Sequence, residues 1–367
     1  MFPDPPDGFS YRFIEHIGSG EFSDVYKVTS TKTGENYACK VVYKNREDHI
    51  HRRYDFKNEV RIMKYINSPY IVQLYEIYED NTNYYIIMEY CAGGTLFNML
   101  VKGHGTNNEQ AREIFYQILV GLSHIHGMKI AHLDIKPENI FLDECNNVKI
   151  GDFGISAYFE ENELTNLTCG TKYYVSPECI SGNEYNPFIS DMWSLGVVLY
   201  SMVTGTLPWK RADKEGLLKM IRNGEFTIPL TVIPEIKEVI QGLLEIDPEN
   251  RWNIEDCLNS RWLYKMDDQN PVAEFRSQFY IFHEESLDNI SLAASAKFNT
   301  TLQMDTEKTL KIISNKYNVI RKRNFPCIKA PIAVTGRSNV RLQYPRRPLR
   351  NHVLCRGLSS LYRSKPY

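Results

Sequence analysis

The sequence lacks the features that mark several common classes of secreted and membrane proteins. Its eight cysteines include no C-x-x-C pair and follow no regular spacing, which argues against a disulfide framework or a cysteine zinc site. The first residues have neither the basic stretch nor the apolar core of a signal peptide. No apolar run is long enough to span a bilayer. We therefore expect a cytoplasmic or nuclear protein with reduced thiols and no transmembrane segment.

Acidic residues are absent from the last part of the chain. Residues 308–367 hold 15 of the 43 Lys and Arg residues and none of the 45 Asp and Glu residues. The remaining 28 basic and 45 acidic residues give the preceding part a charge of −17, against +15 for the tail. An acidic body with a basic tail indicates an acidic partner for the tail, inside or outside the molecule. The length of 367 residues allows two domains, or one bilobal domain with a tail.

Residues suited to phosphoryl transfer are concentrated in one short segment, His132 to Asn139. Asp134 offers a proton acceptor, Lys136 a cation and Asn139 an amide oxygen, and Asp152 follows in an Asp-Phe-Gly triplet. Phosphoryl transfer needs an acceptor for the hydroxyl proton, oxygen ligands for magnesium and positive charge near the phosphates. The two motifs resemble the catalytic loop and the metal-binding triplet of eukaryotic protein kinases.

This resemblance implies a role for each of these residues. Asp134 would orient the substrate hydroxyl and accept its proton, and Lys136 would stabilise the charge of the transferring phosphoryl group. Asn139 and Asp152 would hold Mg²⁺. The Asp-x-Lys-Pro-x-Asn pattern, with Thr171 placed to hydrogen-bond Asp134 and Lys136, is similar to serine/threonine kinases and unlike tyrosine kinases.

Two glycines lie two residues apart, at Gly18 and Gly20, between apolar segments that we expect to be strands. Such a turn lets a backbone approach phosphates closely, although many glycine turns are only turns. In order with the other motifs it resembles the kinase glycine-rich loop. Ser23 stands where that loop usually has its third glycine.

A lysine interrupts an apolar strand at Tyr37 to Val42. Lys40 has an ordinary interpretation, a strand-edge lysine whose ammonium reaches solvent. The resemblance implies instead that Lys40 holds the α- and β-phosphates of ATP and pairs with Glu59, which lies beside an apolar stripe at helical spacing.

Two further strands are predicted at Ile71 to Leu74 and at Tyr84 to Glu89. The second is either an ordinary strand end or, by resemblance, leads into the hinge between two lobes. Met88 would then be the gatekeeper, and backbone groups of Glu89 and Cys91 would meet adenine. The predicted ATP site comprises Ile17, Gly18, Ser19, Gly20, Val25, Ala38, Lys40, Glu59, Met88, Glu89, Cys91 and Phe141.

Leucine stands immediately before the predicted base, where most regulated kinases have arginine. That arginine pairs with a phosphorylated residue in the activation segment, which here runs from Asp152 to Glu178. Leu133 cannot form this pair. Thr165 and Thr168 lie in this segment and carry hydroxyls suited to phosphorylation. We hypothesise that phosphorylation there is not the main switch for activity.

Three residues are predicted to hold the large lobe together. Glu178, in a Ser-Pro-Glu triplet, should form a buried ion pair with Arg251. Asp191 opens an apolar helix and should fix the backbone of the catalytic loop. The phrases Glu89 to Gly94 and Gly205 to Trp209 most resemble the calcium/calmodulin-dependent and sucrose-nonfermenting-like kinase group.

The resemblance covers about residues 11–264 and implies an α+β, bilobal protein-kinase fold. We expect a small lobe of antiparallel strands and a mainly helical large lobe. The predicted organisation is an N-terminal extension at 1–10, a small lobe at about 11–88, a hinge at 89–94, a large lobe at 95–264, a linker and docking segment at 265–307, and a basic regulatory tail at 308–367.

Apolar residues recur at helical spacing among the lysines and arginines of Lys308 to Phe325. A basic amphipathic helix of this kind binds calmodulin, an anionic membrane or an acidic face of its own kinase domain. The alternatives are a solvated helix end followed by disorder, or nucleic-acid binding, for which no known module is visible.

The predicted function is ATP- and Mg²⁺-dependent transfer of the γ-phosphoryl group to serine or threonine hydroxyls of proteins, with an autoinhibitory tail. One alternative is a pseudokinase scaffold, but the lysine, both predicted metal ligands and the predicted base are present. Another is a kinase-fold enzyme acting on small molecules, against which the residues around Thr171 and Glu178 indicate a protein-substrate platform.

Overall fold

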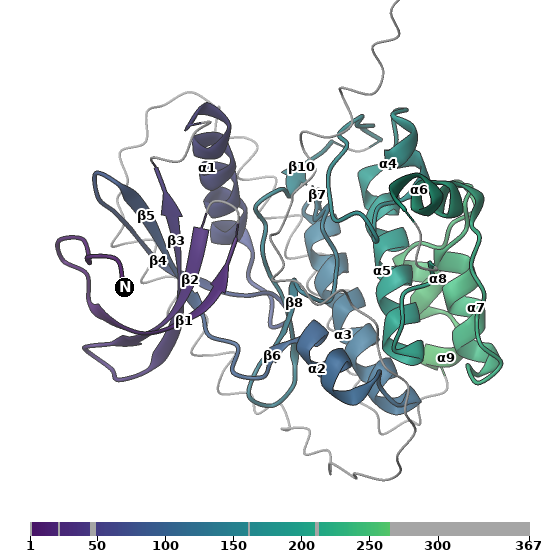
Figure 1. Ribbon diagram of the computed structural model, residues 1–367, viewed down its shortest axis with the longest axis horizontal. Helices are drawn as coiled ribbons and strands as arrows, with labels where there is room; N and C mark the ends of the chain where they lie inside the picture. Colours follow the sequence, from purple (N-terminus) through teal and green to yellow (C-terminus); the bar gives the residue numbers. More distant parts are fainter. Residues whose placement is uncertain (1, 21–22, 45–48, 161, 210–212, 265–367) are drawn as a thin grey trace, which may run out of the picture.

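The computed structural model describes residues 2–20, 23–44, 49–160, 162–209 and 213–264. The predicted linker at 265–307 and basic tail at 308–367 lie outside these residues, as do Glu21 and Phe22 of the glycine-rich loop. The described residues form two lobes, one built around a sheet and one built from helices (Figure 1). The predicted α+β, bilobal fold is therefore confirmed.

The small lobe is one antiparallel sheet of five strands with a helix against one face (Figure 1). The strand order is β1-β2-β3-β5-β4, with β3 pairing to β2 and β5. The elements are β1 (Tyr11–Ser19), β2 (Ser23–Ser30), β3 (Asn36–Tyr43), α1 (His49–Tyr65), β4 (Leu74–Glu79) and β5 (Asn83–Glu89).

The strand predicted at Ile71 to Leu74 is misplaced. The strand begins only at Leu74, and Ile71 forms a parallel bridge with Ile150 of the large lobe. The apolar run at 71–74 is buried because it packs between the lobes, and burial alone does not distinguish such a segment from a strand.

Alternation along β3 sends neighbouring side chains to opposite faces of the sheet. Cys39 and Val41 belong to an apolar cluster on one face. Val42 belongs to the larger core on the other face, together with Phe56 of α1. Lys40 has the same parity as Val42, so its side chain projects toward α1 and the large lobe.

Residues 2–10 pack against the outer face of this sheet. The ring centroids of Phe9 and Phe13 lie 5.4 Å apart, and those of Phe9 and Tyr85 lie 5.6 Å apart. The Tyr85 hydroxyl donates to the carbonyl of Asp4 at 2.9 Å. The extension thus covers aromatic surface that the five strands leave open.

The large lobe contains a two-stranded and a three-stranded sheet on the side of the small lobe, with helices beyond them (Figure 1). Its elements are β6 (Gly94–Thr95), α2 (Leu96–Gly103), α3 (Asn108–Gly127), β7 (Ile130–Ala131), β8 (Ile140–Leu142), β9 (Val148–Ile150), β10 (Ala157–Tyr158), α4 (Pro177–Ser181), α5 (Pro187–Thr204), α6 (Lys214–Asn223), α7 (Pro234–Leu243), α8 (Ile254–Leu258) and α9 (Arg261–Tyr264). None of the described helices is both long and apolar enough to span a membrane.

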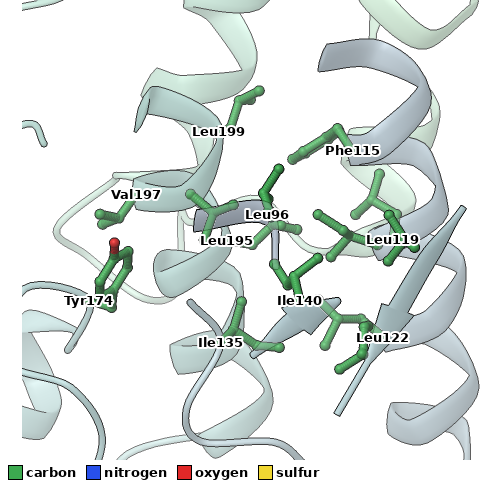
Figure 2. Close-up of a cluster of buried hydrophobic side chains, with 14 of the residues drawn as sticks. Leu96, Phe115, Leu119, Leu122, Ile135, Ile140, Tyr174, Leu195, Val197 and Leu199 are labelled. Atoms are coloured by element: carbon green, nitrogen blue, oxygen red, sulfur yellow. The ribbon is translucent and has the colours of Figure 1, made fainter. Parts of the chain in front are cut away.

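The catalytic loop rests on the core of this lobe. Figure 2 shows Ile135 of the loop and Ile140 of β8 beside Leu122 of α3 and Leu195 of α5. All four side chains are fully buried, and burial of each stabilises the fold by about 1.5–3 kcal/mol. Gly121 lets α3 approach closely, because a Cβ there would lie 2.8 Å from the side chain of Ile150. This packing fixes the backbone on either side of the predicted catalytic residues.

Candidate active site

Lys40 lies between two carboxylates that come from different elements. Its Nζ is 2.7 Å from Glu59 Oε1 on α1 and 3.1 Å from Asp152 Oδ1, which follows β9. Burial disfavours the charged form of Lys40, but Asp152 and Glu59 more than offset this, so its pKa is raised. The ammonium group is therefore charged at neutral pH and joins the small lobe to the large lobe.

Asp152 has a left-handed backbone conformation, with φ of 62°. A non-glycine residue in this region is uncommon and is often found at functional sites. Lys40 is the main cause of its lowered pKa, opposed by burial. The preceding Gly151 N–H donates to the carbonyl of Asn139 at 3.0 Å, which places the two predicted metal ligands on adjoining segments.

Both carboxylate oxygens of Asp134 accept hydrogen bonds. Thr171 Oγ1 donates to Oδ1 at 2.8 Å, and Lys136 Nζ lies 2.5 Å from Oδ2. Asn139 Nδ2 donates to Oδ2 at 3.0 Å, and Lys136 Nζ also donates to Thr171 at 2.8 Å. The carboxylate orientation is thus fixed. Oδ2 already accepts from two donors, whereas Oδ1 accepts from one and retains a lone pair for a further donor.

Asp191 of α5 holds the backbone that leads into this loop. The N–H groups of His132 and Leu133 donate to its two oxygens, each at 2.8 Å. His126 Nε2 of α3 lies 2.9 Å from the same carboxylate, an interaction that the sequence analysis did not anticipate. Asp191 is 1% exposed, so these bonds are protected from competing water.

The residues predicted to bind metal suit an ion shared with phosphates. No cluster of three or more His, Cys, Asp and Glu residues within the described part of the chain could hold a metal by itself. Asn139 uses its amide nitrogen for Asp134, which leaves its amide oxygen as a ligand, and the Asp152 side chain is 47% exposed. Mg²⁺ typically takes one or two protein carboxylates together with substrate phosphates, and this donor set fits that pattern.

The residues predicted to surround adenine meet where the lobes join. Ala38 of β3 pairs in register with Met88 of β5, and Gly18 of β1 pairs with Val25 of β2. At the edge of the described part of the glycine-rich loop, the Gly20 N–H donates to the Ser23 carbonyl at 2.6 Å. Cys91 and Phe141 are partly buried and pack against the larger core, to which both lobes contribute.

Leu133 packs where the usual arginine would bind phosphate. It is 8% exposed, with φ of 65°, and clusters with Ala131 and Phe159. Cys169 and Phe188 pack against this cluster. Apolar contacts thus connect the residue before the predicted base to the activation segment.

The two predicted phosphorylation sites differ in exposure. Thr165 is 8% exposed, and its backbone exchanges two 2.9 Å hydrogen bonds with Tyr185. Thr168 is half-buried. The buried Thr165 is therefore less accessible to a modifying enzyme than Thr168.

Glu178 and Arg251 form a bidentate ion pair. The two guanidinium nitrogens donate to the two carboxylate oxygens at 2.5 and 2.9 Å. The Arg251 guanidinium also lies 5.0 Å from the centroid of the Trp193 ring, and its side chain is fully buried. The pair ties α4 to the loop between α7 and α8.

Three further interactions near the site were not predicted from sequence. Asn58 Nδ2 of α1 donates to the carbonyl of Ser156 at 2.7 Å, and Ser156 Oγ donates to the His132 carbonyl at 3.0 Å. Lys149 of β9 pairs with Glu89 at 2.8 Å. Lys149 carries the same sequence signal as Lys40, a lysine within an apolar strand, whereas Asn58 carries none.

Comparison with known proteins identifies the family. The model of the protein kinase domain matches residues 11–263. CBL-interacting serine/threonine-protein kinase 8 of Arabidopsis thaliana is 35% identical over 314 residues, which cover 84% of this chain and 68% of that protein. CBL-interacting serine/threonine-protein kinase 20 of the same plant is 36% identical over 70% of this chain and 58% of its own length.

A relative from another organism is similar over a comparable share of the chain. Serine/threonine-protein kinase GIN4 of Saccharomyces cerevisiae is 35% identical over 70% of this chain but only 24% of its own length. The matches thus span between about a quarter and two thirds of these relatives. The family predicted from the motifs is confirmed: the chain belongs to the protein kinase family, in its serine/threonine branch.

Proposed function

We propose that this protein transfers the γ-phosphoryl group of ATP to serine or threonine hydroxyls of protein substrates, with Mg²⁺ as the metal. The observation that carries the proposal is the convergence of Lys40, Glu59, Asp134, Asn139 and Asp152 from separate elements. These residues supply the cation, the proton acceptor and the oxygen ligands that the reaction needs.

The residues divide the chemistry between them. Lys40, held by Glu59, neutralises the phosphates that remain on the nucleotide, while Asn139 and Asp152 hold the metal. Bound Mg²⁺ supplies positive charge against the phosphate oxygens. Asp134 orients the substrate hydroxyl and accepts its proton, and Lys136 stabilises the charge of the transferring group.

Two features favour a hydroxyl on a protein chain. Thr171 donates to Asp134 and accepts from Lys136, so it connects the predicted base to the segment that precedes Glu178. That segment is anchored to the large-lobe core through Arg251. An anchored segment beside the base suits an extended peptide better than a small metabolite.

A peptide-library assay tests this proposal. The full-length chain is incubated with γ-labelled ATP, Mg²⁺ and degenerate peptides that carry serine, threonine or tyrosine as the acceptor. We expect label on serine and threonine peptides, and none with Asp152→Asn, which removes a metal ligand without changing side-chain volume. Labelling mainly on tyrosine, or equal labelling by the variant, would contradict the assignment.

We further propose that the basic tail inhibits the kinase domain by intramolecular contact. The tail carries a charge of +15 and the preceding residues −17, which favours their association at low salt. The match to CBL-interacting kinase 8 covers 84% of the chain and therefore includes residues beyond Tyr264. A contact between tail and domain also accounts for a basic segment in an otherwise acidic protein.

Removal of the tail tests the second proposal. The activity of the full chain is compared with that of a chain ending at residue 300, at low and high salt. We expect the truncated chain to be more active at low salt, with the difference shrinking as salt rises. Equal activities at low salt would rule out autoinhibition and direct attention to calmodulin or an anionic membrane as the tail's partner.

A further inference from the structure

A buried ion pair joins the hinge to the large lobe. Lys149 Nζ of β9 lies 2.8 Å from Glu89 Oε1 at the end of β5. The two side chains are only 9% and 16% exposed. Burying two charges is costly unless their geometry is good and the remaining polar atoms are paired. The transfer of the phosphoryl group uses neither side chain, so the pair needs another explanation.

Glu89 connects three segments at once. Its second carboxylate oxygen accepts from the Gln73 N–H at 3.3 Å. The Glu89 N–H in turn donates to the Gln73 carbonyl at 2.9 Å. Gln73 is 6% exposed and directly precedes β4. The carboxylate thus links the small-lobe sheet, the beginning of the hinge and, through Lys149, the large lobe.

Lys149 lies in the strand pair that carries a predicted adenine contact. In the β8–β9 ladder, Lys149 is directly opposite Phe141. The same pair holds the far end of the hinge, because the Gly93 N–H donates to the Leu142 carbonyl at 2.9 Å. The hinge is therefore fixed to β8 and β9 at both ends, by an ion pair at Glu89 and by a backbone hydrogen bond at Gly93.

Cys91 lies in the hinge between these two attachments, and both charged groups affect the pKa of its thiol. Burial raises the pKa of its thiol to about 12, with Glu89 adding to the rise and Lys149 opposing it. Both charged groups are thus close to the hinge residue whose backbone is predicted to meet adenine.

We propose that Lys149 and Glu89 are positioning residues that set the affinity for the adenine nucleotide. The ion pair holds the hinge backbone at a fixed distance from Phe141. The adenine ring then fits between the hinge backbone and Phe141. This inference rests on the proposed function, because it assumes that the hinge binds ATP. Removing either side chain breaks this buried ion pair, and the hinge relaxes away from β9.

Two variants test the role of the pair, with ADP as the probe. Lys149→Met removes the charge and keeps an unbranched chain of similar length. We expect the Kd for ADP and the KM for ATP to rise about tenfold, with kcat within about threefold of native, because the pair affects nucleotide binding and not the chemical step. Lys149→Arg keeps the positive charge and should restore ADP affinity to within about threefold of native.

The matched control is Lys44→Met in the small lobe. Lys44 Nζ lies 2.7 Å from Glu79 Oε1, but the two side chains are 19% and 59% exposed. Lys44 follows the end of β3 that pairs with Asn83, which is the end of β5 opposite the hinge. This variant removes the same charge by the same substitution, and we expect native ADP affinity. Glu89→Gln is the second test variant, because it removes the charge from the other side with little change in volume. If Lys149→Met does not fold, the ADP affinity of Glu89→Gln tests the proposal in its place.

The contradicting result is a folded Lys149→Met or Glu89→Gln protein that binds ADP within about twofold of native, whatever its thermal stability. The pair would then serve only the fold. ADP binding is measured by calorimetry and needs no phosphoryl transfer. A native chain that binds ADP but labels no peptide would therefore overturn the proposed function and leave this test intact.

Discussion

Lys40 Nζ lies 3.1 Å from Asp152 Oδ1, although 112 residues separate the two positions in the sequence. The first residue belongs to the small-lobe sheet and the second follows a strand of the large lobe. Glu59 on α1 completes the group at 2.7 Å. Carboxylates from α1 and from the large lobe thus both contact one ammonium group. A nucleoside triphosphate with its metal ion requires such an arrangement of charges.

This relationship predicts how stability depends on pH. The pKa of Asp152 is lowered from 3.8, mainly by Lys40. A lowered folded-state pKa gives stability that is fully present above the unfolded value and is lost as pH falls through the folded value. The pKa of Lys40 is raised from 10.5, so its contribution is present below that value and is lost only as pH rises through the folded value.

The measurement compares the urea midpoints of the native chain and Asp152→Asn over a range of pH. We expect the difference between them to be constant from about pH 5 to pH 9, and to shrink only as the pH falls below about 4 and through the lowered folded-state pKa of Asp152. A difference that already disappears between pH 7 and pH 6 would require a raised pKa for Asp152 and would contradict the arrangement described.

The cluster around Leu133 predicts activity without phosphorylation of the activation segment. Apolar contacts with Phe159 and Cys169 order that segment, so no phosphate is needed to pair with a cation. We expect the double variant Thr165→Ala/Thr168→Ala to keep peptide-kinase activity within about threefold of native. A loss of about a hundredfold or more would show that phosphorylation is the switch after all.

The same cluster predicts the effect of restoring the usual arginine. Leu133→Arg places a guanidinium among Ala131, Phe159 and Phe188, with no phosphate to compensate it. We expect the free energy of unfolding to fall by about 2–4 kcal/mol, measured by urea denaturation. Leu133→Met, which conserves volume, serves as the control and should cost less than about 1.5 kcal/mol. Equal stability of Leu133→Arg and the native chain would refute the packing argument.

The ion pair of Glu178 and Arg251 predicts a large loss of stability. Because the Arg251 side chain is fully buried, Arg251→Ala leaves the Glu178 carboxylate with no cation in a mostly buried position. We expect the free energy of unfolding to fall by about 3–5 kcal/mol. Lys129→Met removes a cation from an exposed pair with Glu160, and its denaturation midpoint should stay close to native. Similar midpoints for the two variants would show that burial of the Arg251 pair carries no extra stability.

The fold and the placement of the candidate catalytic residues were predictable because they depend on local patterns. The residues from His132 to Asn139 carry their chemistry in eight consecutive positions, and packing of Ile135 and Ile140 fixes their backbone (Figure 2). The pairings of Lys40 and Arg251 followed from the same resemblance, because a buried cation requires a partner of opposite charge.

Other relationships depend on tertiary packing that no local pattern encodes. The strand predicted at Ile71 is displaced, because a buried segment between lobes has the same composition as a strand. His126 contacts Asp191 from a different helix, and no local sequence pattern indicates this partner. Lys149 carried a usable signal, a charge within an apolar strand, but its partner Glu89 became apparent only from the structure.

The most direct test of the account is the rate of phosphoryl transfer in Asp134→Asn. The amide keeps the volume of the side chain but cannot accept a proton from a substrate hydroxyl as the carboxylate does. We expect kcat to fall by at least about a hundredfold, while the Kd for MgADP stays within about threefold of native. A variant that binds MgADP normally and phosphorylates peptides at the native rate would contradict the central claim, that Asp134 is the base in this reaction.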